Sequence, residues 1–313
     1  MNIIKPSRLR RGDLISIVSP ASAPREPSKI HKAIRYFESL GYRVTISKNV
    51  FDVNGYLAGT DEERAEDLNE AFADKNVKAI ICSRGGYGTP RILDKIDYNI
   101  IKKNPKIFVG YSDITALQLA ILKKTGLVTF SGPMMAVEFG GNVDAYTEQM
   151  FFDMLTRSDK IGPLRSHRDF RFSFKGKKKS RGRLIGGNLS LIVSILGTAY
   201  VPNFSGSILL FEEVSEEPYS IDRMLVQLRL AGVLSEVSGV ALGQFTHCKP
   251  EEPNKPYRTI EQILREDLYS TGITTVSNLP YGHVPIKMTL PIGVLASVDP
   301  MRKKFSIDEA AVI

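Results

Sequence analysis

The first 126 residues alternate between short apolar runs and segments with apolar residues every three or four positions. The runs are typical of buried strands and the periodic segments of amphipathic helices. Such alternation predicts a Rossmann-like parallel sheet with helices on both faces and ligands beyond the carboxyl ends of its strands. The expected strands are 14–22, which ends in a loop of small residues, 42–47, 77–83 and 106–110. The expected helices are 28–40, one opened by a capping box at Thr60, one beginning near Thr89, and 113–124.

The pattern changes after about residue 150. Residues 151–180 are polar and irregular, so we interpret them as a linker between an N-terminal domain, 1–150, and a C-terminal domain, 181–313. Short strand patterns dominate the C-terminal domain, with two helices expected around 185–196 and 221–231, which predicts a β-rich α+β unit. The expected strands are 207–214, 237–245, 274–280, 294–300 and 304–312.

The composition is that of a folded globular protein, with 42% hydrophobic and 24% charged residues. The net charge of +8 would suit nucleic acid, an anionic surface or a substrate rich in carboxylates. The densest basic cluster, 175–183, lacks interleaved aromatic residues and a reading helix. We therefore favour a solvated loop there and expect no nucleic-acid partner.

Cys82 and Cys248 are far apart and have no metal-ligand spacing, so neither a disulfide framework nor a metal site is expected. The start of the chain lacks the apolar region of a signal peptide, and no segment reaches the length that spans a bilayer. These features predict a cytoplasmic protein without a membrane partner.

A serine stands where the strand 106–110 turns directly into a helix, in the stretch Gly110-Tyr111-Ser112-Asp113. This position puts the hydroxyl of Ser112 at the carboxyl edge of the sheet, beside the N–H groups that open the helix. It suits a nucleophile and partly matches the G-x-S-x-G elbow, although Ile114 occupies the second glycine position. The segment alone favours the simpler interpretation that Ser112 caps the helix.

The loop Ser83–Gly88 favours the nucleophile over the helix cap, because it holds three glycines after the preceding strand. Glycines let the backbone approach a ligand closely and aim N–H groups at it, as an oxyanion hole requires. One such N–H and that of Asp113 would hold the oxygen of a tetrahedral intermediate. A dinucleotide site is disfavoured, since no G-x-G-x-x-G opens the first strand–helix turn.

Several sequence blocks follow one another along nearly the whole chain. They are RLRRGDLISIVSPAS, GYLAGTDEERAEDLNEAF, SRGGYGTPRIL, VGYSDITAL, GGNLSLI, LLFEEVSEEPYSIDRML, GQFTHC and YGHVPIKMTLPIG. In this order, the blocks resemble the LD-carboxypeptidase family of serine peptidases, which includes murein tetrapeptide carboxypeptidases and microcin C self-immunity hydrolases.

The resemblance implies a Ser-Glu-His triad. It puts the nucleophile at Ser112 in VGYSD, the acid at Glu212 in LLFEEV and the base at His283 in YGHVP. From spacing alone, Glu212 or Glu213 would serve as the acid, and the family match favours Glu212. Because both partners lie in the C-terminal domain, the site is expected in the cleft between the domains.

The resemblance also makes the backbone N–H groups of Gly86 and Asp113 the expected oxyanion hole. Arg84 and Tyr87, in the same glycine loop, are candidate substrate contacts, and a guanidinium would suit a substrate carboxylate. A surface or helix-capping role for Arg84 stays open. The family mechanism needs no cofactor or metal.

By resemblance, the substrate is a murein tetrapeptide that loses its terminal D-alanine during cell-wall recycling, and the protein is a homodimer. The nearest alternative is a microcin-immunity type hydrolase of peptidyl or aminoacyl nucleotide analogues. A third interpretation is a muropeptide-binding module without turnover, which the presence of Ser112, Glu212 and His283 disfavours.

Overall fold

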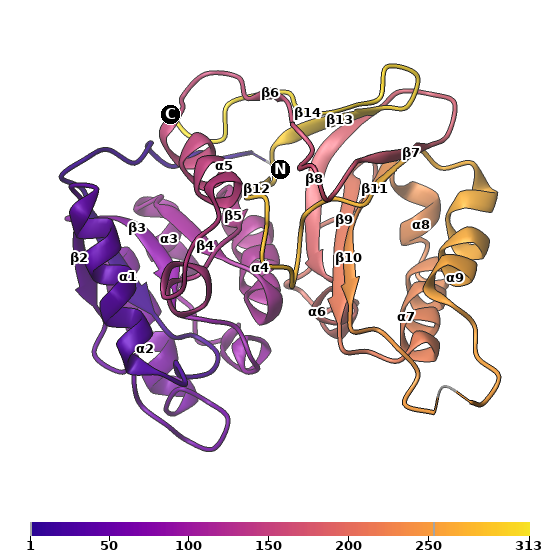
Figure 1. Cartoon of the computed structure of the whole chain (residues 1–313). Helices are drawn as coiled ribbons and strands as arrows, with labels where there is room; N and C mark the ends of the chain where they lie inside the picture. Colours follow the sequence, from indigo (N-terminus) through magenta and orange to yellow (C-terminus); the bar gives the residue numbers. More distant parts are fainter. Residues whose placement is uncertain (1, 253) are drawn as a thin grey trace.

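The chain folds into two sheets that lie side by side, each accompanied by its own helices (Figure 1). A computed structural model describes residues 2–252 and 254–313. Within this part of the chain, no helix combines the length and the apolar character needed to cross a membrane.

The first sheet has the strand order β12-β5-β4-β3-β1-β2. Strands β1 to β5 are parallel, and β12 pairs antiparallel with β5 at the edge. The order reverses between β1 and β3, which is where doubly wound sheets bind ligands. The predicted Rossmann-like sheet is confirmed. Its strands are β1 (Leu14–Val18), β2 (Arg43–Ile46), β3 (Val77–Cys82), β4 (Ile107–Gly110), β5 (Thr129–Ser131) and β12 (Leu290–Ile292).

Helices cover both faces of this sheet, as right-handed crossovers require. On one face, Phe37 packs against Phe139 and Phe151, which brings α1 (Pro27–Ser39), the π-helical turn η3 (Met135–Phe139) and α5 (Ala145–Thr156) together. On the other lie α2 (Asp61–Ala73), α3 (Tyr98–Lys103) and α4 (Thr115–Thr125). Helix α4 is buried on nearly all sides because it also contacts the second sheet.

The second sheet has the order β6-β14-β13-β8-β9-β10-β11-β7. Strands β8, β9, β10 and β11 are parallel and the strands outside them pair antiparallel, which confirms the predicted α+β character. Its strands are β6 (Gly162–Pro163), β7 (Ser173–Lys175), β8 (Ser180–Asn188), β9 (Ile208–Val214), β10 (Gly239–Thr246), β11 (Thr275–Ser277), β13 (Leu295–Asp299) and β14 (Lys304–Ile307), and its helices are α6 (Leu189–Ser194), α7 (Pro218–Leu230), α8 (Val233–Glu236) and α9 (Ile260–Asp267).

Two helix predictions were wrong in extent. The helix expected near Thr89 is the 3-10 turn η1 (Thr89–Ile92), and α3 starts separately because Asp97 caps it. The helix expected over 185–196 is only α6, since residues 184–188 pair with β9 as the end of β8. The basic cluster is likewise a loop only over 176–179, because β8 takes up its last residues.

The predicted domain limits stay a prediction, and four elements bear on them. Helix α5 runs across residue 150, and β6 and β7 lie within the expected linker. Strand β12 comes from the expected C-terminal domain but completes the first sheet (Figure 1). The chain therefore returns to the first sheet near its end.

The capping box predicted for α2 is present. Thr60 Oγ1 accepts from the N–H of Glu63 at 3.2 Å, and Glu63 Oε2 accepts from the N–H of Thr60 at 2.7 Å. We expect Thr60→Ala to lower the free energy of unfolding by about 1 kcal/mol, since it removes the acceptor for an otherwise unpaired N–H. Urea denaturation measures this, with Thr60→Ser as the control. A stability loss as large in the serine variant would contradict the capping role.

Candidate active site

Ser112 stands at a strained turn at the carboxyl end of β4. Its φ of +66° lies in the left-handed region, which costs a non-glycine residue about 1 to 2 kcal/mol. Gly85 faces it so closely that a Cβ there would stand 2.9 Å from the Cβ of Ser112. The turn η2 (Ser112–Ile114) has no side-chain cap hydrogen bond. The conformation therefore presents the hydroxyl to the neighbouring segments instead of to the helix end.

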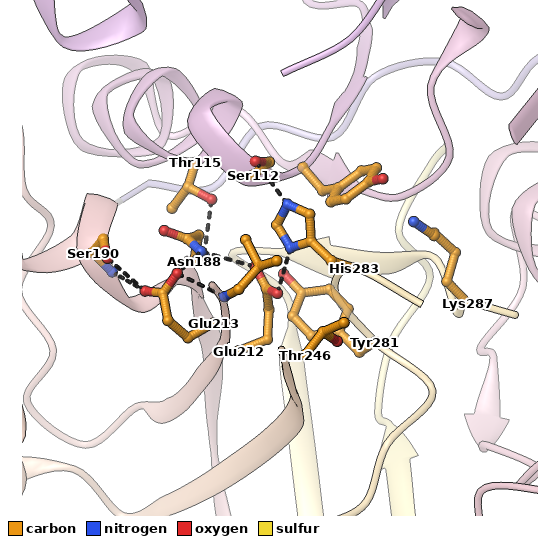
Figure 2. A network of polar contacts seen from close by, with 12 residues as sticks. Ser112, Thr115, Asn188, Ser190, Glu212, Glu213, Thr246, Tyr281, His283 and Lys287 are labelled. Carbon is orange, nitrogen blue, oxygen red and sulfur yellow. Dashed lines mark hydrogen bonds and ion pairs between the residues drawn. The ribbon is translucent and has the colours of Figure 1, made fainter. Parts of the chain in front are cut away.

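The hydroxyl of Ser112 is the first member of a chain of hydrogen bonds. Nε2 of His283 lies 2.9 Å from Ser112 Oγ, and Nδ1 lies 2.9 Å from Glu212 Oε2, so the imidazole stands between the other two side chains (Figure 2). An ionised carboxylate only accepts, so Nδ1 carries the hydrogen and Nε2 is free to accept from the serine. The structure brings together the three residues predicted from the resemblance.

Glu212 reaches His283 from the end of β9, where it is only 1% exposed. Two glycines make room for it. At Gly282, whose φ is +102°, a Cβ would occupy the space next to Glu212 Oε2. At Gly243, a Cβ would stand 2.8 Å from the Cβ of Glu212. The residue just before His283 thus has to be small for the carboxylate to approach the imidazole.

The neighbouring carboxylate, Glu213, has different partners. It accepts from the N–H and the hydroxyl of Ser190 at 2.7 and 2.6 Å, and from the N–H of Val214 at 2.8 Å. Burial raises its pKa, against the opposing effect of these donors. Of the two acids that spacing left open, only Glu212 is hydrogen-bonded to His283.

Asn188 links the two carboxylates, a role that the sequence did not reveal. Its Nδ2 donates to Glu212 Oε1 at 3.2 Å and to Glu213 Oε1 at 2.8 Å (Figure 2). Its backbone N–H donates to Thr115 Oγ1 at 3.0 Å, which ties β8 to the helix that follows Ser112. Asn188 therefore fixes the second sheet against the first beside the serine.

A buried ion pair lies on the other side of His283. Lys287 Nζ is 2.6 Å from Glu138 Oε1 and 3.7 Å from the ring centre of Tyr111, whose hydroxyl donates to the same oxygen at 3.1 Å. The Tyr111 ring meets the imidazole edge to face, with centres 5.2 Å apart. Burial, reinforced by Glu138, raises the pKa of Tyr111. No motif in the sequence predicted this group.

A cleft of about 400 Å³ opens onto Ser112 and His283. Arg84, Gly85 and Gly86 line it, whereas Tyr87 is 46% exposed and packs edge to face on Tyr56 beyond the cleft lining. The other lining residues are Arg25, Glu26, Lys29, Tyr111, Met134, Ala136 and Val137. In residues 2–252 and 254–313, no group of three His, Cys, Asp or Glu side chains is placed to hold a metal ion.

Asp113, next to the serine, is 1% exposed, and its carboxylate accepts from the N–H of Thr89 at 2.8 Å. This bond joins the turn after β4 to the end of the glycine loop. Burial raises the pKa of Asp113 to about 6, although the hydrogen bonds from Thr89 and Gly88 oppose that shift. The backbone rather than the side chain of Asp113 is the part predicted to face a substrate.

The Lys287–Glu138 pair gives a stability prediction. Lys287→Met leaves a buried carboxylate without its cation, so we expect the free energy of unfolding to fall by about 3 to 5 kcal/mol. Lys287→Met/Glu138→Gln removes both charges and should recover part of that loss. Urea denaturation of the two variants and the wild type measures it. A double variant less stable than the single one would contradict the pairing.

The raised pKa of Asp113 gives a pH prediction. The folded state prefers the protonated acid, so ionised Asp113 destabilises the fold above about pH 6, and this penalty disappears as the pH falls towards 4. The side chain of the Asp113→Asn variant does not titrate. As the pH falls from 6.5 to 4, the free energy of unfolding of the wild type should therefore rise by up to about 3 kcal/mol relative to that variant. Denaturation curves of both proteins at several pH values test this. A constant difference would show that the pKa is not raised.

Family models match both halves of the chain. The LD-carboxypeptidase N-terminal domain matches residues 15–132, and the LD-carboxypeptidase C-terminal domain matches residues 181–298. The first match contains Ser112, and the second contains Glu212 and His283.

Individual proteins are similar to this chain over almost its whole length. A protein of Bacillus subtilis named probable murein peptide carboxypeptidase is 39% identical over 98% of this chain and 95% of its own. The microcin C7 self-immunity protein MccF of Escherichia coli is 30% identical over 95% of this chain and 94% of its own.

Solved structures of similar proteins have the same fold as this chain. MccF in complex with glutamyl sulfamoyl guanosine superposes with a TM-score of 0.91 at 28% identity, over 99% of each chain. The muramoyltetrapeptide carboxypeptidase of Oxalobacter formigenes superposes with a TM-score of 0.80 at 32% identity, over 95% of this chain and 98% of its own. The chain belongs to the LD-carboxypeptidase family of serine carboxypeptidases.

Proposed function

We propose that this protein hydrolyses the L,D peptide bond that holds the terminal D-alanine of murein tetrapeptides. The observation that carries the proposal is the hydrogen-bonded chain from Ser112 through His283 to Glu212. Similarity to proteins named murein peptide carboxypeptidase and muramoyltetrapeptide carboxypeptidase supports the substrate class. The cytoplasmic location expected from the sequence and the homodimer implied by the resemblance stay predictions.

In the proposed mechanism, His283 Nε2 takes the hydroxyl proton of Ser112 as Oγ attacks the carbonyl carbon of the scissile bond. The resulting imidazolium is stabilised by the adjacent carboxylate of Glu212, which also holds the ring in the required tautomer. His283 then gives the proton to the leaving amine of D-alanine. Water activated by the same imidazole hydrolyses the ester on Ser112 and restores the hydroxyl.

The negative oxygen of the tetrahedral intermediate needs donors in place before the reaction. We assign this role to the backbone N–H groups of Gly86 and Asp113. The left-handed turn at Ser112 and the close approach of Gly85 support the assignment, because they bring the glycine loop against the nucleophile. A donor of this kind contributes about 3 to 4 kcal/mol to the transition state.

A second candidate is hydrolysis of aminoacyl nucleotide analogues, favoured by the similarity to MccF bound to glutamyl sulfamoyl guanosine. The same three side chains would serve, because both substrates present an acyl carbon to the serine. An aromatic side chain would stabilise a nucleobase by stacking on it. This chain contains no tryptophan, and we assign that contact to the exposed pair Tyr56 and Tyr87 beside the glycine loop.

The test is release of D-alanine from a purified murein tetrapeptide. We expect the wild type to release it and Ser112→Ala or His283→Ala to reduce kcat by at least about 10³-fold. Ser235→Ala, an exposed serine of α8, is the matched control and should behave like the wild type. Equal product from the wild type and Ser112→Ala would contradict the nucleophile.

The same proteins, incubated with glutamyl sulfamoyl guanosine, separate the candidates. Cleavage of the nucleotide analogue alone would replace the murein assignment with the microcin-immunity type. Binding of the tetrapeptide without product, with fully folded wild type, would support the non-catalytic binding module and overturn the enzymatic proposal.

A further inference from the structure

Two arginines line the cleft beside Ser112. Arg25 comes from the loop between β1 and α1, and Arg84 from the loop between β3 and η1. Because β1 and β3 are adjacent parallel strands, both loops leave the sheet at the same edge, at the point where the strand order reverses. The fold thus brings two arginines from distant parts of the sequence into the lining of one cleft.

These cations have no anion of their own in residues 2–252 and 254–313. Glu26, the single carboxylate that lines the cleft, is paired with Lys29 at 2.8 Å. Neither arginine is hydrogen-bonded or ion-paired to another side chain in the described part of the chain. The cleft therefore carries an uncompensated positive charge.

Arg84 is the less solvated of the two, since it is half-buried and Arg25 is exposed. Burial lowers the pKa of Arg84, and the charge of Arg25 lowers it further. Holding two like charges close together in a partly buried place is unfavourable without an anion between them. An anionic group of the ligand would relieve both the repulsion and the loss of hydration.

Arg84 also lies close enough to the nucleophile to contact the residue that leaves. Gly85, the residue after Arg84, packs against Ser112. In a peptide cut before its last residue, the terminal carboxylate lies only about 3 to 4 Å from the scissile carbonyl carbon, the span of one residue. A guanidinium presents a planar fork that binds a carboxylate through two hydrogen bonds.

We propose that Arg84 and Arg25 form a carboxylate site that binds the free terminal carboxylate of the leaving residue, with Arg84 as the direct partner and Arg25 as the second cation. This inference rests on the proposed function and adds the reason for exopeptidase action: the cleft accepts a peptide that ends one residue after the scissile bond. A peptide whose end is amidated leaves the two cations unpaired and is disfavoured.

The experiment compares the murein tetrapeptide with its C-terminal amide, using the full chain. We expect Arg84→Met to lower kcat/KM for the acid about 10- to 100-fold while changing that for the amide less than about threefold. Arg25→Met should act in the same direction with a smaller effect. Arg35→Met, an exposed arginine of α1, is the matched control. An equal loss for acid and amide in Arg84→Met would overturn the site.

Binding to Ser112→Ala, measured by calorimetry, separates this inference from the proposed function. The site is supported if the acid binds more tightly than the amide and if adding Arg84→Met abolishes this difference. This result would support the site even if the wild type released no D-alanine. Absence of D-alanine release would defeat only the proposed reaction. Equal binding of acid and amide overturns the carboxylate site, whatever the wild type releases.

Discussion

The geometry of the site depends on how residues 278–289 are held between the two sheets. This segment leaves β11 in the second sheet and enters the first sheet as β12 (Figure 1). Between the two strands it carries His283, which is hydrogen-bonded to Ser112. On the second sheet, the N–H of Leu279 donates to the carbonyl of Leu242 at 3.1 Å. On the first, the hydroxyl of Tyr281 is 2.7 Å from Ser131 Oγ. The imidazole is thus positioned by attachments on both sides.

The other residues of the site depend on how the two sheets are held together. Glu212 belongs to the second sheet and Ser112 to the first, so the hydrogen-bonded chain through His283 joins the two. Asn188 is a further link between the sheets, and the Lys287–Glu138 pair ties the segment 278–289 to η3 beside the first sheet. Because each link is buried and polar, a small displacement of the sheets would leave unpaired groups behind. The arrangement favours one relative position.

Local strain occurs at the residue where the chemistry is proposed to begin. Ser112 keeps a left-handed conformation, and Gly85 and Gly282 stand where a side chain would collide with Ser112 or Glu212. Such features persist when the surrounding structure holds them in place. Here α4, buried on nearly all sides, and the adjoining strands supply that support. The cleft beyond them is open and positively charged, which suits an acidic peptide.

The sequence alone determined the elements whose signals are local. Apolar runs located most strands, the capping box at Thr60 located the start of α2, and matched motifs singled out Ser112, Glu212 and His283, whose catalytic roles are proposed here. It misplaced the helix over 185–196, because glycines and apolar residues there suit either structure until β9 pairs with them. Only the tertiary structure decided that Asn188 joins two carboxylates, that Lys287 faces Glu138, that Arg25 lies beside Arg84 in one cleft, and that β12 returns to the first sheet. Each of these depends on contacts between segments far apart in the chain, and such contacts leave no periodic signal in the sequence.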